Sequence, residues 1–200
     1  MSTIPSRLKL LLAALALSPA ALAHPPETDD FGLKVQVLRK GDELHTAAVF
    51  HVPLDKCQAY HFLVDYDASA QIPGVISSKL TRLADNKVRV ELKLEERILH
   101  FPVRLLSVLE ITELPSYGTD FVQVKGEIPS FKGSWRLSEG ENGTNYRYQA
   151  VAKPDSVLPM FVIRYFIEHS LTERFAALAK LATERRGRSA RQCGQSGNSA

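Results

Sequence analysis

The longest helical pattern in the chain runs from Pro159 to Arg186, a segment with no internal glycine or proline. Apolar residues recur there at spacings of three and four, which is typical of a helix with one buried face. The residues of this stripe are Met160, Ile163, Ile167, Leu171, Leu178, Leu181 and Ala182, with Phe175 at its edge. We therefore predict a long C-terminal helix that packs one side against a sheet.

The first two turns of this helix are apolar on the opposite side as well, at Phe161, Val162, Tyr165 and Phe166. A helix that is apolar all round needs a second surface to bury against. A loop, a partner protein, a membrane surface or a bound apolar molecule would each provide one. A dimer contact through Phe161, Tyr165 and Phe166 is one form of the partner alternative.

The rest of the chain is dominated by alternating strand patterns. Residues 33–37 and 44–52 predict a hairpin. Asp55 then suits the N-cap of a short helix that reaches about Asp65, and a second short helical piece follows. Six further strand segments follow, at 75–83, 88–95, 103–112, 121–128, 131–137 and 144–152, of which 103–112 is apolar on both faces. This order predicts an α+β fold, with a curved antiparallel sheet of about six or seven strands around the long helix.

The strand at 88–95 has the clearest alternation, with Val88, Val90, Leu92 and Leu94 on one face. Glu91, Glu95 and Glu96 resemble an acidic cluster. On this alternation Glu91 and Glu95 face the solvent among Arg89 and Lys93, so we interpret the cluster as a solvated face.

The two ends of the chain predict one domain over 24–186. Residues 1–23 combine basic Arg7 and Lys9, a short apolar run and Ala21-Leu22-Ala23, which is typical of a signal peptide cleaved near Ala23. We expect a periplasmic or secreted protein. Residues 187–200 are rich in Gly, Ser and Gln and are expected to be a disordered tail. A disulfide between Cys57 and Cys193 is possible after export, although it would close on this mobile tail.

Composition and motifs exclude several classes of function. The chain carries 25 Lys and Arg against 22 Asp and Glu. The excess lies in the signal and the tail, so no nucleic-acid-binding face is expected. The six histidines form no zinc-type pair, and there is no phosphate loop or G-x-S-x-G motif. We expect no metal, no cofactor and no catalytic residue that the sequence could name. Membrane contact would be peripheral at most.

Several local motifs carry a resemblance to a known superfamily. They are Asp65-Tyr66, Pro73-Gly74-Val75, Gly133-Ser134-Trp135, and Gly143-Thr144 with Tyr146 and Tyr148. With the long helix, residues 43–186 resemble the START-like (SRPBCC) superfamily. The most similar branch holds polyketide cyclase/dehydrase-like and coenzyme Q-binding-like proteins. The resemblance implies a helix-grip fold with an apolar cavity between sheet and helix.

Strand and helix parity select the residues that would line such a cavity. They are Val90, Leu92, Phe101, Trp135, Tyr146, Tyr148, Met160, Ile163, Ile167 and Leu171. For Trp135, Tyr146 and Tyr148, core packing is an equally good interpretation.

Three hypotheses follow for the function. The first is an exported protein that binds a hydrophobic small molecule or lipid in the cavity. The second is a cyclase or dehydratase acting on a polyketide-like or aromatic substrate in the same cavity, which would need an inward titratable side chain. The strand parity offers Tyr146 and Tyr148 for this, but no clear carboxylate. The third is an interaction adaptor that uses the apolar start of the helix.

Overall fold

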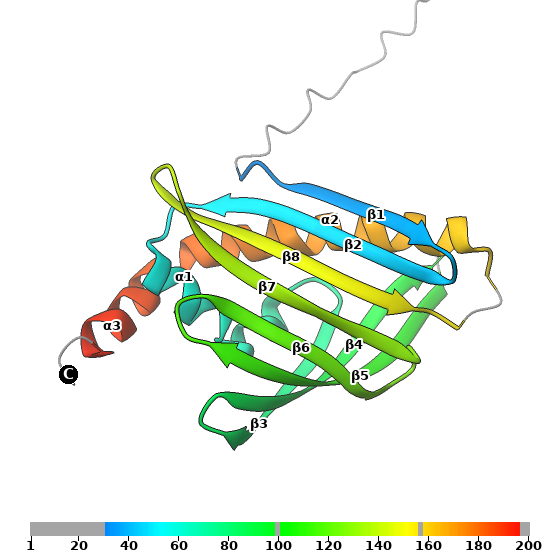
Figure 1. The fold of residues 1–200 in the computed structure, drawn as a ribbon, viewed down its shortest axis with the longest axis horizontal. Coiled ribbons are helices and arrows are strands. Elements are labelled where there is room, and N and C mark those ends of the chain that lie inside the picture. Colours follow the sequence, from blue (N-terminus) through cyan, green and yellow to red (C-terminus); the bar gives the residue numbers. More distant parts are fainter. Residues whose placement is uncertain (1–30, 99–100, 156–157, 197–200) are drawn as a thin grey trace, which may run out of the picture.

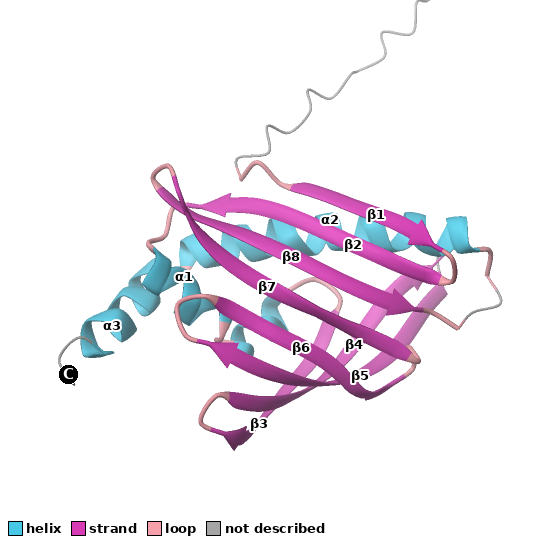
Figure 2. Ribbon diagram, viewed as in Figure 1, coloured by secondary structure: helices cyan, strands magenta, loops and turns pink. Residues whose placement is uncertain are grey.

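The computed structural model describes residues 31–98, 101–155 and 158–196. Its centre is one curved antiparallel sheet of eight strands, in the order β1-β2-β8-β7-β6-β5-β4-β3 (Figure 1 and Figure 2). The strands are β1 Lys34–Lys40, β2 Glu43–Val52, β3 Val75–Ala84, β4 Lys87–Ile98, β5 Phe101–Leu114, β6 Gly118–Gly126, β7 Ser130–Gly140 and β8 Gly143–Lys153. The predicted α+β helix-grip fold is confirmed. There are eight strands rather than six or seven, because each alternating segment forms a strand of its own.

Four helical segments complete the fold. The short helix α1 spans Lys56–Leu63, the 3-10 helix η1 spans Tyr66–Gln71, and α2 and α3 span Met160–Glu184 and Arg186–Ser196. Asp55 caps α1 as predicted, because its side chain accepts a hydrogen bond of 2.8 Å from the backbone N–H of Gln58. No helix in the described part of the chain is both long enough and apolar enough to cross a bilayer.

Helix α2 lies on the inner side of the sheet and packs against β1 and β2 (Figure 1). Its buried residues are Phe175, Ala179 and Ala182, all in the second half of the helix. Phe175, predicted at the edge of the apolar stripe, is instead central, with ring centroids 5.3 Å from Trp135 and 5.1 Å from Tyr148. The two alanines are small enough to let the helix backbone approach the sheet closely.

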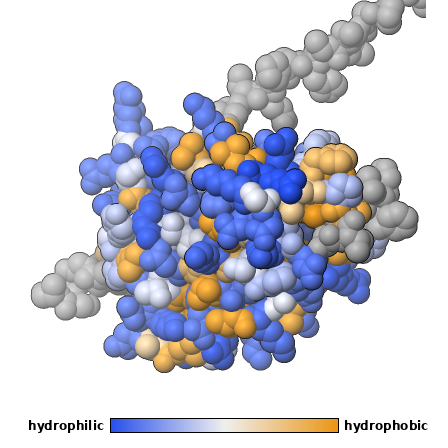
Figure 3. All heavy atoms as spheres, turned by 45° about the vertical axis from the view of Figure 1, so that its right-hand side comes forward, coloured by the Kyte–Doolittle hydropathy of each residue, from blue (hydrophilic) through white to orange (hydrophobic). Residues whose placement is uncertain are grey.

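The first half of α2 is much less covered. Phe161 is 72 % exposed and Tyr165 is 65 % exposed. Figure 3 shows apolar side chains gathered at the right-hand end of the molecule, where α2 begins. Among the described residues, therefore, Phe161 and Tyr165 of the second apolar face that the sequence predicted remain exposed, whereas Val162 and Phe166 are partly buried.

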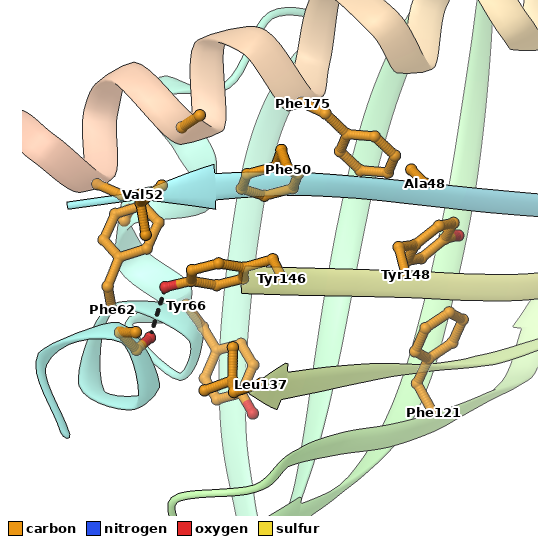
Figure 4. Close-up of a cluster of buried hydrophobic side chains, with 14 of the residues drawn as sticks. Ala48, Phe50, Val52, Phe62, Tyr66, Phe121, Leu137, Tyr146, Tyr148 and Phe175 are labelled. Atoms are coloured by element: carbon orange, nitrogen blue, oxygen red, sulfur yellow. Dashed lines mark hydrogen bonds between the residues drawn. The ribbon is translucent and has the colours of Figure 1, made fainter. Parts of the chain in front are cut away.

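The end of the interior next to α1 and η1 is packed solidly (Figure 4). Tyr146 is 0 % exposed, stacks on Phe50 at 5.0 Å, and donates a 2.8 Å hydrogen bond to the carbonyl of Ala59. Thr144 donates another of 2.8 Å to the carbonyl of Leu54. These two bonds attach α1 and the chain before it to β8, and they seal this end of the sheet.

The C-terminal segment differs from the expected disordered tail. Residues 186–196 form α3, and Cys193 is joined to Cys57 of α1 by a disulfide with Cα atoms 6.0 Å apart. Arg185, the residue that ends α2, donates a 2.8 Å hydrogen bond to the carboxylate of Asp65. The polar composition of the segment does not favour order by itself. The disulfide and the ion pair supply contacts to distant residues that composition cannot reveal.

We predict that the Cys57–Cys193 disulfide stabilises the whole domain. The Cys57→Ser variant should lose about 2 to 4 kcal/mol of unfolding free energy, because the bond restricts the unfolded chain and holds α3 against α1. Denaturant titration with and without a reducing agent measures this. The reducing agent should lower the stability of the wild type and leave that of Cys57→Ser unchanged. Equal stability of reduced and oxidised wild type would contradict the prediction.

Candidate functional site: the interior between the sheet and helix α2

The burial of inward-facing side chains decreases along the strands of the sheet. On β4, Val88 and Val90 are 0 % and 2 % exposed, whereas Leu92 and Leu94 on the same face are only partly buried. Exposure therefore rises toward the end of β4 that lies near the middle of α2. Apolar side chains that face inward yet remain partly accessible indicate that the described side chains leave this part of the inner face incompletely covered.

The first half of α2 is likewise only partly covered. Met160, Ile163 and Ile167 are partly buried and do not belong to the core cluster, whereas Leu171 packs against the edge of that cluster. The helix thus joins the core from about Leu171 onward. Before that point, the apolar stripe of α2 is not packed into the core, and on β4 Leu92 packs against the core cluster while Leu94 does not belong to it.

An ion pair fixes the position where α2 meets β4. Arg174 lies 2.6 Å from the carboxylate of Glu96 and donates a 3.0 Å hydrogen bond to the carbonyl of Pro73. Ser170 donates a 2.9 Å hydrogen bond to the same carboxylate. Gly74 has a φ of +78°, and a Cβ atom there would collide with the Arg174 guanidinium. The Pro73-Gly74-Val75 motif therefore lets the loop approach the helix closely.

The assignment of Glu96 to a solvated face was wrong. Glu96 has the same strand parity as Leu92 and Leu94, so it points inward toward α2, while its neighbour Glu95 pairs with the exposed Arg104 at 3.2 Å. The alternation of β4 could have shown this. Arg174 was also missed, although it lies one turn from Ser170 and Leu178 on the inward side of the helix.

A second inward carboxylate lies at the sealed end. Glu113 is buried and accepts 3.1 Å hydrogen bonds from the hydroxyl of Tyr66 and the guanidinium of Arg82. Burial raises the pKa of Tyr66 well above its usual value, and the negative charge of Glu113 adds to this, so the phenol stays protonated and donates. The sequence reading found no clear inward carboxylate because residues 103–112 look apolar on both faces, and Glu113 follows directly after them.

Two aromatic side chains border the open part of the interior. Trp135 and Tyr148 have ring centroids 4.8 Å apart, and Tyr148 is 7 % exposed. Burial raises the pKa of Tyr148, while the nearby Arg174 acts weakly in the opposite direction, so the hydroxyl is neutral at physiological pH. Neither the Tyr148 hydroxyl nor the Trp135 indole N–H has a hydrogen-bond partner among the described residues.

The predicted lining residues therefore divide into three groups. Val90 and Tyr146 belong to the solid core. Tyr148 is also a member of the core cluster. Leu92, Trp135 and Leu171 pack against that cluster, and Met160, Ile163 and Ile167 lie on the less covered half of α2. The side chain of Phe101 lies outside the described part of the structure. The two tyrosines differ, since Tyr146 donates to an internal acceptor whereas Tyr148 has no hydrogen-bond partner among the described residues.

Two other features of the structure lie apart from this interior. A shallow depression of about 560 Å³ on the outer face of the sheet is lined by outward residues such as His45, Lys132 and Gln149, and by none of the predicted lining residues. In the described part of the chain, Cys57, His61 and Cys193 bring ligand-type atoms within 4.8 Å of one another. Both sulfurs are used in the disulfide, so this group is not free to bind a metal ion.

Comparison with solved structures gives clear likenesses of fold. A STAR-related lipid transfer protein from Xanthomonas axonopodis aligns with a TM-score of 0.61 and 19 % identity, over 76 % of this chain and 93 % of that one. The Zhui aromatase/cyclase from a Streptomyces species aligns with a TM-score of 0.58 and 13 % identity, over 74 % and 98 %. A Thermus thermophilus protein aligns with a TM-score of 0.60 and 14 % identity, over 71 % and 96 %.

These likenesses confirm the START-like helix-grip fold that the sequence motifs predicted. Comparisons with family models and with curated proteins gave no match. A relation to the coenzyme Q-binding-like branch in particular stays a prediction.

We predict that Glu96 and Arg174 are energetically coupled across the interior. Glu96→Gln and Arg174→Met should each cost about 2 kcal/mol of unfolding free energy, because each leaves a partly buried charge without its counter-charge. The double variant should cost clearly less than the two single effects added together. Denaturant titration of the four proteins measures the coupling.

Glu95→Gln is the matched control, since it removes the neighbouring carboxylate from an exposed pair and should change stability by about 0.5 kcal/mol or less. Strictly additive effects of the two interior variants would show that the ion pair does not hold α2 to β4.

Proposed function

We propose that this protein binds a hydrophobic small molecule or lipid between its curved sheet and the first half of α2. The observation that carries the proposal is the exposure gradient on β4, from fully buried Val88 to partly accessible Leu92 and Leu94. Space bounded by apolar side chains and a few polar groups is the usual form of a small-molecule site. The printed names of similar structures, a lipid transfer protein and an aromatase/cyclase, support a ligand of this class.

The proposed site of action is outside the cytoplasm. Residues 1–23, whose pattern predicts a signal peptide, lie outside the described residues. The Cys57–Cys193 disulfide is independent support, because disulfides persist mainly in oxidising compartments such as the periplasm. A carrier there would keep an apolar compound in solution between the places where it is made and used.

The competing proposal is a cyclase or dehydratase, and the inward carboxylates Glu96 and Glu113 are the observation in its favour. Each of them, however, is already bound to an arginine, Arg174 or Arg82. An arginine partner occupies the carboxylate oxygens that would have to take up a substrate proton. The arrangement therefore favours binding over general acid–base catalysis.

Ligand recovery tests the binding proposal directly. The mature chain, purified from its native host without detergent, should show an adduct of constant mass in native mass spectrometry, and solvent extraction should remove this adduct. The extracted protein should bind an apolar fluorescent probe, and the organic extract should compete with that probe. A chain that carries no adduct and is stabilised by no member of a panel of lipids and aromatic compounds would contradict the proposal.

Substitutions that add volume on the inner face of β4 should distinguish an effect on ligand binding from an effect on stability. Leu92→Phe adds volume at the open part of β4, so it should change stability by about 1 kcal/mol or less while weakening probe binding several-fold. Val88→Phe, the matched control two residues away in the sealed part, should cost about 1 to 3 kcal/mol through overpacking. Thermal unfolding and probe titration measure both. Equal destabilisation by the two variants would show that the interior is filled throughout.

A further inference from the structure

Two hydroxyl groups on the inner face have no hydrogen-bond partner among the described residues. The Tyr148 hydroxyl has no hydrogen bond to any described residue, although the side chain is more than nine-tenths buried. The Ser78 hydroxyl is buried and unpaired on β3, directly opposite Leu92 of β4. Buried polar groups without a protein partner are rare, and they usually bond to water or to a ligand.

The setting of the Tyr148 hydroxyl differs from that of Tyr146, two residues earlier on the same face of β8. The Tyr146 hydroxyl is sealed in the core and donates to Ala59. The Tyr148 hydroxyl points away from the sealed end in Figure 4, where Phe175 and Phe121 lie on either side of its ring. Their ring centroids are 5.1 Å and 6.0 Å from that of Tyr148. Because the oxygen is neither bonded nor among the fully enclosed unpaired atoms, it borders open space.

The charge balance around this hydroxyl limits what could bind there. Arg174 is close enough to act on the pKa of Tyr148, but its charge is already matched by Glu96 at 2.6 Å. A ligand carboxylate would enter a site with no free positive charge and would lie near the Glu96 carboxylate. The cost of burying an uncompensated charge therefore opposes an anion, whereas a neutral hydrogen-bond acceptor meets no such cost.

We propose that the ligand is a neutral, largely apolar molecule with a carbonyl oxygen, and that this oxygen accepts a hydrogen bond from Tyr148. This inference rests on the binding function proposed above and adds the ligand's polar group and its orientation. The carbonyl end enters first, toward Tyr148 and Trp135. The apolar remainder extends along Leu92 and Leu94 of β4 and the stripe of Ile163 and Ile167 on α2. A ketone, quinone or ester satisfies this description, and a hydrocarbon or a free acid does not.

Three probes of the same size test the inference: methyl naphthyl ketone, ethylnaphthalene and naphthoate. Affinities are measured by fluorescence titration of the full mature chain. The wild type should bind the ketone more tightly than either of the others. In Tyr148→Phe, the ratio of ketone to ethylnaphthalene affinity should fall about five-fold, the contribution of one neutral hydrogen bond. Ethylnaphthalene itself should bind about as well as before, because the ring is retained.

Tyr146→Phe is the matched control, since it removes a hydroxyl that is already bonded inside the core. It should lower stability and leave the affinity ratio unchanged. If the wild type binds none of the three probes, the proposed binding function itself fails. If it binds ketone and ethylnaphthalene equally, or if Tyr148→Phe keeps the ketone preference, binding stands and the carbonyl inference is overturned. A preference for naphthoate would show that Arg174 is available to an anion, and it would overturn the inference as well.

Discussion

The arrangement of the interior depends on how helix α2 packs on the curved sheet, because this helix covers only part of the inner face. Helix α2 reaches the core only through its second half, where Phe175, Ala179 and Ala182 are buried. The Glu96–Arg174 ion pair lies at the boundary between this packed half and the less covered half. A polar link at that point holds the helix to β4 without a large apolar contact. One end of the helix is thus part of the core, and the side chains of the other end are only partly buried.

The two ends of the interior consequently serve different purposes. At the sealed end, α1 and η1 press against the sheet, and Tyr146, Thr144 and Tyr66 each donate a hydrogen bond to an internal acceptor. Toward the start of α2, the inner leucines are only partly buried, and the hydroxyl of Tyr148 has no described partner. Solid packing near α1 and η1 stabilises the domain, whereas partly buried leucines and a hydroxyl without a partner contribute less to its stability. Such a loss of folding stability is typical of a binding site.

Much of this arrangement could be predicted from the sequence, because strand alternation and helix periodicity report directly on burial. The hairpin, the capped α1, the consecutive strands and α2 all follow from such patterns. The alternation on β4 also contains the inward position of Glu96, because Glu96 has the parity of Leu92 and Leu94. Other features depend on contacts between distant residues. The partnership of Tyr66 with Glu113 and the order of α3 through Cys57 and Cys193 are of this kind. Local patterns carry no signal for either.

A crystal structure of the mature chain, purified natively and without added ligand, tests the central claim most directly. The account predicts electron density that belongs to no protein atom, or ordered water at the hydroxyl of Tyr148, between residues 160–171 of α2 and the inner face of β4. Side chains of α2 packed directly onto Leu92 and Leu94, with no space left between helix and sheet, would contradict it.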